Sequence, residues 1–216
     1  MKLQYLGHSC FRIISEMGMT ILCDPYKTQM VGLPMPQVRC DVVTMSHHHN
    51  DHDCLENVLG TPTEIDIQGE CVADDVALQS FETFHDDKKG SLRGKNLVFT
   101  FSVDGLRVVH MGDVGCLDEK LAQNLHGCDL LMLPVGGNYT IDHVGAKWYV
   151  DKIQPKLVVP MHYSFGTSKI DIAPVDDFLQ QFEQNQIRHV GDTLNLYDQP
   201  QNETPLVYVM DMWQED

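Results

Sequence analysis

The stretch SHHHNDHD at Ser46–Asp53 contains the pattern His-x-His-x-Asp-His, and the interpretation of the whole chain starts from it. On a helix, His47 and His49 would point about 200° apart, but on an extended chain side chains at i and i+2 face the same side. An extended loop therefore lets His47 and His49 bind one metal ion, while Asp51 and His52 turn toward a second. The plainer alternative is a solvated histidine-rich loop that binds nickel or zinc by accident.

The residues before this stretch favour the metal site. Residues 41–45 read Asp-Val-Val-Thr-Met, an apolar and β-branched run that is typical of a buried strand. A strand that ends just before Ser46 would place the histidines on a loop at the edge of a sheet, where functional residues are common.

The composition bounds the class of protein. The chain has 216 residues, of which 43% are hydrophobic and 21% charged, as in a soluble globular domain with a sizeable core. Fifteen Lys and Arg against 31 Asp and Glu give a formal net charge of −16, which disfavours nucleic acid and anionic membranes as partners. We expect no signal peptide and no membrane span, because no apolar run approaches the roughly 20 residues that a span needs.

The cysteines indicate a reducing compartment. There are seven, they are scattered, and none forms a Cys-x-x-Cys pair. An odd, unpatterned set fits buried thiols better than disulfides or a zinc-thiolate site. We therefore expect a cytoplasmic protein.

Periodicity predicts a chain rich in strands. Strands are expected at residues 2–6, 11–16, 19–23, 41–45, 64–73, 76–84, 97–103, 106–109, 129–135, 156–159 and 204–210. Helices are expected at residues 143–154, with Asp142 as N-cap, and at residues 174–187, whereas the proline-rich residues 25–38 form a loop. Since no linker or repeat divides the chain, we predict a single α/β domain, residues 1–216, built on two stacked sheets with outer helices.

Three further metal-ligand candidates lie just after predicted strands. A site for two metals needs about three protein ligands per ion and a group shared between the ions. His85, Asp113 and His162 could complete such a set, with a carboxylate as the shared group. Taken singly, each has a plainer explanation, since a histidine after a strand is often solvated and an Asp after a Gly is often a turn residue.

Several motifs occur together in a familiar order. They are Gly7-His8-Ser9-Cys10, Cys23-Asp24-Pro25, the His47–His52 pattern, His85, His110-Met111-Gly112-Asp113, Leu133-Pro134-Val135-Gly136-Gly137-Asn138-Tyr139-Thr140 and Pro160-Met161-His162-Tyr163. With these motifs the chain resembles the metallo-β-lactamase fold superfamily. Within it, the chain is similar to small bacterial metal-dependent hydrolases related to L-ascorbate-6-phosphate lactonase. The resemblance implies a four-layer αββα sandwich with its active site at one edge of the sheets.

The resemblance also implies a role for each ligand. Carried over, the first metal is bound by His47, His49 and His85, the second by Asp51, His52 and His162, and Asp113 bridges the two. Asp51 and Asp113 would be the catalytic carboxylates. Asp24 matches a motif residue that supports the histidine loop from behind the ligands.

Other residues are weaker candidates for substrate binding or for support of the ligands. His8 faces the pocket or has a structural role, and His110 supports a ligand or packs in the core. Candidates in loops near the site are Asn138, Tyr139, Tyr163 and, in the basic segment 86–95, Lys88, Lys89 and Arg93. This segment reverses the charge of an acidic chain and could attract a phosphate or carboxylate. The alternative is a solvated loop whose basic residues balance nearby acids.

The expected activity is hydrolysis. Two divalent ions about 3.5–4 Å apart would activate a hydroxide for attack on a small, anionic lactone, thioester, amide or phosphoester. The ligands suit Zn²⁺, with Mn²⁺ or Fe²⁺ as alternatives. Three other functions stay open: a phosphodiesterase or nuclease of the same superfamily, a non-haem di-iron redox protein, and a non-catalytic metal-binding module. The expected partner is a small-molecule substrate, and an exposed sheet edge could support a homo-oligomer.

Overall fold

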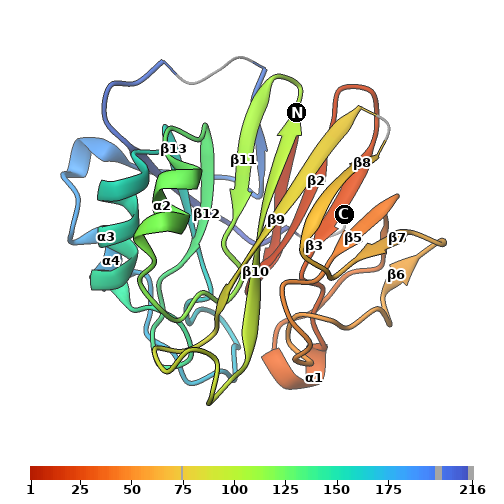
Figure 1. The fold of residues 1–216 in the computed structure, drawn as a ribbon, viewed down its shortest axis with the longest axis horizontal. Coiled ribbons are helices and arrows are strands. Elements are labelled where there is room, and N and C mark those ends of the chain that lie inside the picture. Colours follow the sequence, from red (N-terminus) through yellow and green to blue (C-terminus); the bar gives the residue numbers. More distant parts are fainter. Residues whose placement is uncertain (74, 198–200, 214–216) are drawn as a thin grey trace.

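The computed structural model describes residues 1–73, 75–197 and 201–213, and Figure 1 shows two β-sheets stacked face to face. The first sheet contains β1 (Lys2–Gly7), β2 (Cys10–Ile14), β3 (Thr20–Cys23), β5 (Val42–Thr44), β7 (Thr63–Ile65) and β15 (Thr193–Asn195). Within the described residues, its strand order is β15-β1-β2-β3-β5-β7.

The second sheet is larger and combines a hairpin region with a parallel region. Its strands are β8 (Gly69–Ala73), β9 (Val76–Phe84), β10 (Lys95–Val103), β11 (Leu106–His110), β12 (Leu130–Pro134), β13 (Leu157–Met161), β14 (Ile187–Val190) and β16 (Leu206–Met210). In the described part of the chain the order is β14-β16-β13-β12-β11-β10-β9-β8, antiparallel from β8 to β11 and parallel from β11 to β14.

Helices cover the outer face of the second sheet. They are α2 (Glu119–Leu125), α3 (His143–Ile153) and α4 (Asp176–Leu179), which Figure 1 shows side by side beyond β12 and β13. The first sheet is covered by α1 (Thr28–Val31) and a small sheet of β4 (Val38–Arg39) and β6 (Val58–Leu59). Among the described residues, no helix combines the length and apolar composition that crossing a membrane requires.

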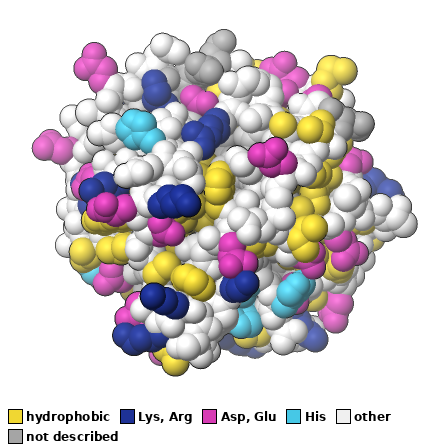
Figure 2. All heavy atoms as spheres, in the orientation of Figure 1, with side chains coloured by type: hydrophobic (Ala, Val, Ile, Leu, Met, Phe, Trp, Pro, Cys, Tyr) yellow, Lys and Arg dark blue, Asp and Glu magenta, His cyan; other side chains and the backbone are white. Residues whose placement is uncertain are grey.

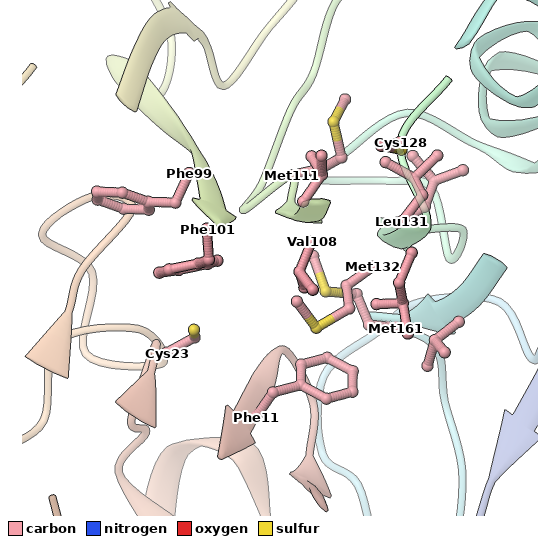
Figure 3. Close-up of a cluster of buried hydrophobic side chains, with 14 of the residues drawn as sticks. Phe11, Cys23, Phe99, Phe101, Val108, Met111, Cys128, Leu131, Met132 and Met161 are labelled. Atoms are coloured by element: carbon pink, nitrogen blue, oxygen red, sulfur yellow. The ribbon is translucent and has the colours of Figure 1, made fainter. Parts of the chain in front are cut away.

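The main core fills the space between the sheets. Figure 3 shows Phe11 of β2 pointing toward Val108 and Met132 of the other sheet, with Phe99 and Phe101 of β10 beside them. All five side chains are completely buried. Burial of each stabilises the fold by about 1.5–3 kcal/mol. A second cluster, which includes Leu22, Val31 and Val43, packs α1 and its loops against the outer face of the first sheet.

Most of the predicted elements are present, and the α/β fold class is confirmed. Helix α3 begins where expected, because the Asp142 side chain accepts hydrogen bonds from the backbone N–H groups of Val144 and Gly145. The seven cysteines are all free, as expected, and four of them are buried. The prediction of a single domain over the full chain is not tested by these observations.

Two of the predicted elements are wrong. The helix expected at residues 174–187 is only α4, a 3-10 turn at Gln184–Gln186 and then strand β14. Only the last residue of that stretch, Ile187, belongs to β14 (Ile187–Val190), an edge strand in which it pairs with Val207 of β16. The strand expected at residues 64–73 is two strands, β7 and β8, which belong to different sheets. Helices α1 and α2 and the short strands β4, β6 and β15 were not predicted, and α1 lies within residues 25–38, where a loop was expected.

Candidate metal centre

The candidate ligands gather where strands of both sheets end. Strands β1, β3 and β5 run in one direction, and so do β9, β11 and β13, so the carboxyl ends of each set share an edge. The residues that follow these ends are His8 after β1, Asp24 after β3, His47–His52 after β5, His85 after β9, Asp113 after β11 and His162 after β13. The two sheets thus bring residues 154 positions apart in sequence, His8 and His162, into one site.

One group of ligand atoms belongs to three histidines. The ligand nitrogens of His47, His49 and His85 all lie within 4.8 Å of one another. The ring of His47 is 4.5 Å from that of His49 and 4.6 Å from that of His85, measured between centroids. The exposed neighbour His48 points away, with its ring nitrogens near Asp53 and Asp66. Although the loop bends at residues 46–49 instead of running extended, it places His47 and His49 on one side and His48 on the other, as expected.

A second group contains one residue more than the sequence predicts. The ligand atoms of Asp51, His52 and His162 lie within 4.8 Å of one another and of a ring nitrogen of His8. His8 is 1% exposed, and its Nε2 lies 3.4 Å from Oδ2 of Asp51. His8 was only a weak candidate in the sequence, because nothing in the chain indicates on which side of β1 its ring lies.

Asp113 lies between the two groups. Its Oδ2 is 3.1 Å from Nε2 of His52 and 3.2 Å from Nε2 of His162. The same oxygen is 3.4 Å from Nε2 of His85 and 4.0 Å from Nε2 of His47. A single carboxylate that faces both groups can be shared by two cations.

The donor set fits metal ions. Buried side-chain atoms normally have hydrogen-bond partners. Within the described residues, buried atoms without one include Nε2 of His8, His47 and His52 and Oδ1 of Asp113. Unpaired nitrogen and carboxylate lone pairs that converge on one place are what a divalent cation would satisfy.

Asp24 and Ser46 hold two ligands in place. The Asp24 carboxylate accepts a hydrogen bond from Nδ1 of His52 at 2.8 Å, which leaves Nε2 of His52 free to bind a metal. It also accepts bonds from the backbone N–H and the hydroxyl of Ser46. The Ser46 hydroxyl lies 2.9 Å from Nδ1 of His47. Ser46 was missed as a functional residue, although its position directly before the motif was a usable signal.

Asn96 holds the backbone on both sides of Gly112 and so positions Asp113. Its Oδ1 accepts a hydrogen bond from the backbone N–H of Asp113 at 2.7 Å, and its amide donates to the carbonyl of Met111. Gly112, at φ +53°, lies between them, and a side chain there would collide with Asn96 and Ser46. No sequence signal pointed to Asn96, because its role depends on the pairing of β10 with β11.

Comparison with known proteins identifies the family. A family model described as "Beta-lactamase superfamily domain" matches residues 2–162, more than half of the chain and all of its candidate ligands. The chain belongs to the beta-lactamase superfamily. A curated metal-dependent hydrolase (UPF0173) from Geobacillus thermodenitrificans is 30% identical over 195 residues, covering 76% of this chain and 86% of the relative. One from Archaeoglobus fulgidus is 28% identical, covering 76% and 84%.

A solved structure agrees with this membership of the beta-lactamase superfamily. A Thermotoga maritima protein, described as a candidate Zn-dependent hydrolase of the metallo-beta-lactamase superfamily, is 36% identical to this chain. The alignment covers 97% of this chain and 99% of that protein, with a TM-score of 0.80. These similarities confirm the prediction of a metal-dependent hydrolase of this superfamily.

The ligands of this superfamily member differ in their protonation. Burial lowers the pKa of His47 and of His85, and burial lowers the pKa of His8 to about 4, so these rings are neutral at neutral pH. Burial would raise the pKa of Asp113, but His162 and His52 hold it well below its usual value. Burial would also lower the pKa of His52, but Asp113 and Asp24 hold it well above its usual value.

Left-handed backbone is concentrated at this centre. His8, Asp24, Asn138 and His162 have φ between +45° and +60°, a region that non-glycine residues rarely adopt. Such conformations cost about 1–3 kcal/mol each and persist where the surrounding structure enforces them. Here a backbone bond from the N–H of His162 to the carbonyl of His8 links two of the four directly.

A cavity of about 430 Å³ opens over the ligands. Its lining is Met30, His49, Asp51, His85, Arg93, Asp113, Tyr139, Lys169, Ile170 and Asp171. Arg93 lies over the Tyr139 ring at 5.4 Å and donates to the carbonyl of Asn138. Figure 2 shows Lys, Arg and His side chains on the lower part of the face of the molecule that it presents. In Figure 1, this is the end of the molecule where the strands that precede the candidate ligands end. Lys169 was not singled out in the sequence, because it is distant from every motif.

The other predicted substrate residues do not line this cavity. Lys88 and Lys89 are exposed, and the Lys88 ammonium lies 3.0 Å from Asp87. Tyr163 is buried against Phe165. The buried ring of His110 contacts the carbonyl of Ser9 through Nε2, which is a structural position. The Asn138 amide donates to the carbonyl of Asp171.

The basic segment 86–95 is ordered around one carboxylate. Asp86 is buried, and its two oxygens accept hydrogen bonds from the backbone N–H groups of Lys88, Gly90, Leu92 and Arg93 at 2.8–3.0 Å. These bonds fix the backbone from which the Arg93 side chain reaches the cavity. Asp86 was not predicted, although the run Asp-Asp-Lys-Lys-Gly directly after His85 is a recognisable turn signal.

Proposed function

We propose that this chain is a dinuclear metal-dependent hydrolase that acts on a small anionic molecule. The observation that supports it is the position of Asp113, whose Oδ2 lies 3.2 Å from Nε2 of His162 and 3.4 Å from Nε2 of His85. These histidines belong to different ligand groups, so one carboxylate serves both. A site for a single ion would not need two separate groups of histidines.

The chain's own residues hold and orient the reacting groups. His47, His49 and His85 would hold one cation, and the group around His52 would hold the other. When bound, two divalent cations supply Lewis acidity and lower the pKa of water toward about 7. Asp113, kept ionised by the histidines around it, supplies negative charge to both ligand groups and can accept a hydrogen bond from a nearby water. Asp24 and Ser46 keep the ring nitrogens of the ligands aimed at the centre.

The cavity lining supports an anionic substrate. Arg93 and Lys169 lie in the same cavity as Asp51, Asp113 and Asp171. Two divalent cations would make the net charge of this lining positive, although the whole chain carries −16. A local reversal of this kind draws anions to the site. The volume of about 430 Å³ suits a metabolite-sized molecule.

Metal content and turnover test the proposal together. Protein purified without chelator or affinity nickel should contain about two metal ions per chain, and Asp113→Asn, which keeps the shape but removes the charge, should lose metal. The metal-loaded wild type should hydrolyse at least one member of a panel of lactones, thioesters, amides and phosphoesters that carry a carboxylate or phosphate.

Three results would contradict the proposal. One metal ion per chain, unchanged in Asp113→Asn, would exclude the shared carboxylate. Two iron ions with redox-dependent colour and no hydrolysis would favour the di-iron redox protein. Preference for a nucleic acid or a simple phosphodiester over small anionic substrates would favour the nuclease alternative. Zn²⁺ as the native ion and the cytoplasm as the location are further parts of the proposal.

A further inference from the structure

We propose that His8 is a fourth protein ligand of the second metal site, through Nε2, and that the two sites are therefore unequal. This inference rests on the proposed function, because it needs two metals. With His8, the second site has four protein ligands of its own, whereas the first has three histidines, and each site also faces Asp113. The first site would then keep the more open coordination, as catalytic metal sites do.

The distances allow a single ion to reach all four ligands. Two atoms that each lie about 2.1 Å from one ion can be at most about 4.2 Å apart. The ligand atoms of His8, Asp51, His52 and His162 are all within 4.8 Å of one another, and Oδ2 of Asp51 lies 3.4 Å from Nε2 of His8 and 3.7 Å from Nε2 of His52, so modest side-chain movements would bring all four to one ion. The ring of His8 is 4.4 Å from that of His162 and 5.1 Å from that of His52.

The backbone of His8 is held in the conformation that aims its ring inward. Its φ is +55°, and its carbonyl accepts hydrogen bonds from the Tyr5 hydroxyl at 3.0 Å and from the backbone N–H of His162 at 2.9 Å. The preceding Gly7 has φ +102°, and a side chain there would collide with Tyr26 and Met212. Several elements therefore enforce a backbone conformation that a histidine would not choose by itself.

The environment of Nε2 points to a ligand. His8 is 1% exposed, and its Nε2 is buried without a hydrogen-bond partner in the described part of the chain. An unpaired buried polar atom costs about 1–3 kcal/mol, which a metal bond would remove. His8 does not line the substrate cavity, so a substrate group is a poor candidate for this position.

The competing role is a hydrogen bond to Asp51. The 3.4 Å between Nε2 of His8 and Oδ2 of Asp51 would allow a protonated Nε2 to orient that carboxylate. The two roles differ in one measurable respect. A ligand carries the metal on Nε2 and its proton on Nδ1, whereas a donor carries the proton on Nε2.

Nuclear magnetic resonance of the zinc-loaded protein separates these roles. Protein labelled with ¹⁵N in its histidines is titrated with Zn²⁺ alone, and the His8 ring signals are assigned with His8→Asn, since Asn tolerates a left-handed backbone. We expect the Nε2 signal of His8 to move to the position of a metal-bound nitrogen and to carry no proton. A protonated Nε2 in the protein with two Zn²⁺ ions would overturn the inference.

Metal affinity gives a second readout. Loss of a residue that hydrogen-bonds to a metal ligand lowers metal affinity about 10–100-fold, so loss of a ligand itself should lower it about 100-fold or more. In His8→Asn, the affinity for one Zn²⁺ ion should therefore fall by this factor, and the affinity for the other should stay unchanged. In the control His48→Asn, whose residue is exposed, neither affinity should change. His8→Gln can still donate to Asp51, so wild-type affinity in His8→Gln would also overturn the inference.

The outcomes separate this inference from the proposed function. Wild-type protein that binds only one Zn²⁺ would contradict the dinuclear site, and the His8 ring signal in that sample would still show whether Nε2 binds the metal. Two Zn²⁺ ions with a protonated His8 would contradict only the inference. Far-UV circular dichroism of the metal-free variants shows whether they fold, and His8→Gln replaces His8→Asn if the latter does not.

Discussion

The hydroxyl of Ser46 lies 2.6 Å from Oδ2 of Asp24, and this contact connects the loops that follow β3 and β5, next to the candidate metal ligands. The same hydroxyl lies 2.9 Å from Nδ1 of His47. A serine can donate one hydrogen bond and accept others. Ser46 therefore donates to Asp24 and accepts from His47, which places the metal-binding lone pair of His47 on Nε2.

Ser46→Ala tests this arrangement. The change leaves Nδ1 of His47 without its partner, so the ring can rotate and the metal is held less well. We expect Zn²⁺ affinity to fall about 10–100-fold for one equivalent, in line with the loss of a residue behind a ligand. Isothermal titration with a competing chelator measures it. Ser91→Ala, in the exposed part of segment 86–95, is the control, and equal affinities in the two variants would contradict the prediction.

Arg93 and Lys169 are expected to bind the anionic group of the substrate. Replacing either with Ala should raise KM for an anionic substrate about 10-fold, which corresponds to about 1.4 kcal/mol, with a smaller effect on kcat. An uncharged analogue should show no such change. Lys88→Ala serves as the control, because that ammonium is exposed and lies beside Asp87. Steady-state kinetics at two salt concentrations checks the result, since exposed charges are screened by salt.

Asp86→Ala should loosen the segment that carries Arg93. Four backbone N–H groups lose their acceptor, so their hydrogen exchange should become faster, while exchange in the sheets stays unchanged. KM should rise as Arg93 loses its fixed position. Hydrogen-exchange mass spectrometry is the measurement, with the exposed neighbour Asp87→Ala as the matched control. Unchanged exchange in residues 88–93 would show that other contacts hold this segment.

The metal-free protein should lose stability as the pH falls from about 6.5 to 4. Burial lowers the pKa of His8 from 6.5 to about 4, so the unfolded chain binds a proton in this range before the folded chain does. Stability therefore rises with pH through this window, and His8 alone contributes about 2 kcal/mol between pH 4.5 and 7. His110, whose pKa is also lowered by burial, acts in the same direction, while the raised pKa of His52 opposes it.

Urea unfolding of the metal-free protein at pH 7 and pH 4.5 checks this dependence. The free energy of unfolding of the wild type should fall by about 2 kcal/mol more than that of His8→Asn over this interval. Equal losses in the two proteins would show that His8 is not buried in a neutral form. At lower pH, protonation of carboxylates with lowered pKa, such as Asp24, should reduce stability further.

The sequence by itself indicated the candidate ligands in the His-x-His-x-Asp-His pattern, which the structure brings together. Alternation along an extended chain is a local property, so it already separates His47 and His49 from His48. The same holds for the Asp142 cap of α3, which needs only the next three residues. Local rules failed at residues 174–187, where the helix ends at Leu179 and the chain turns at Gln184–Gln186 into β14, whose position is set by pairing with the distant β16.

Only the tertiary structure decided which distant residues support the centre. Ser46 and Asn96 act through hydrogen bonds to Asp24 and Asp113, which are distant from them in the sequence. Lys169 lines the cavity, and its backbone N–H donates a hydrogen bond to the carbonyl of Val31. His8 becomes a ligand candidate because β1 ends at the same edge as β13, and that alignment is a property of two stacked sheets. Sequence patterns reflect interactions between residues that are close along the chain, whereas a metal site is assembled from residues that are distant along the chain and close in space.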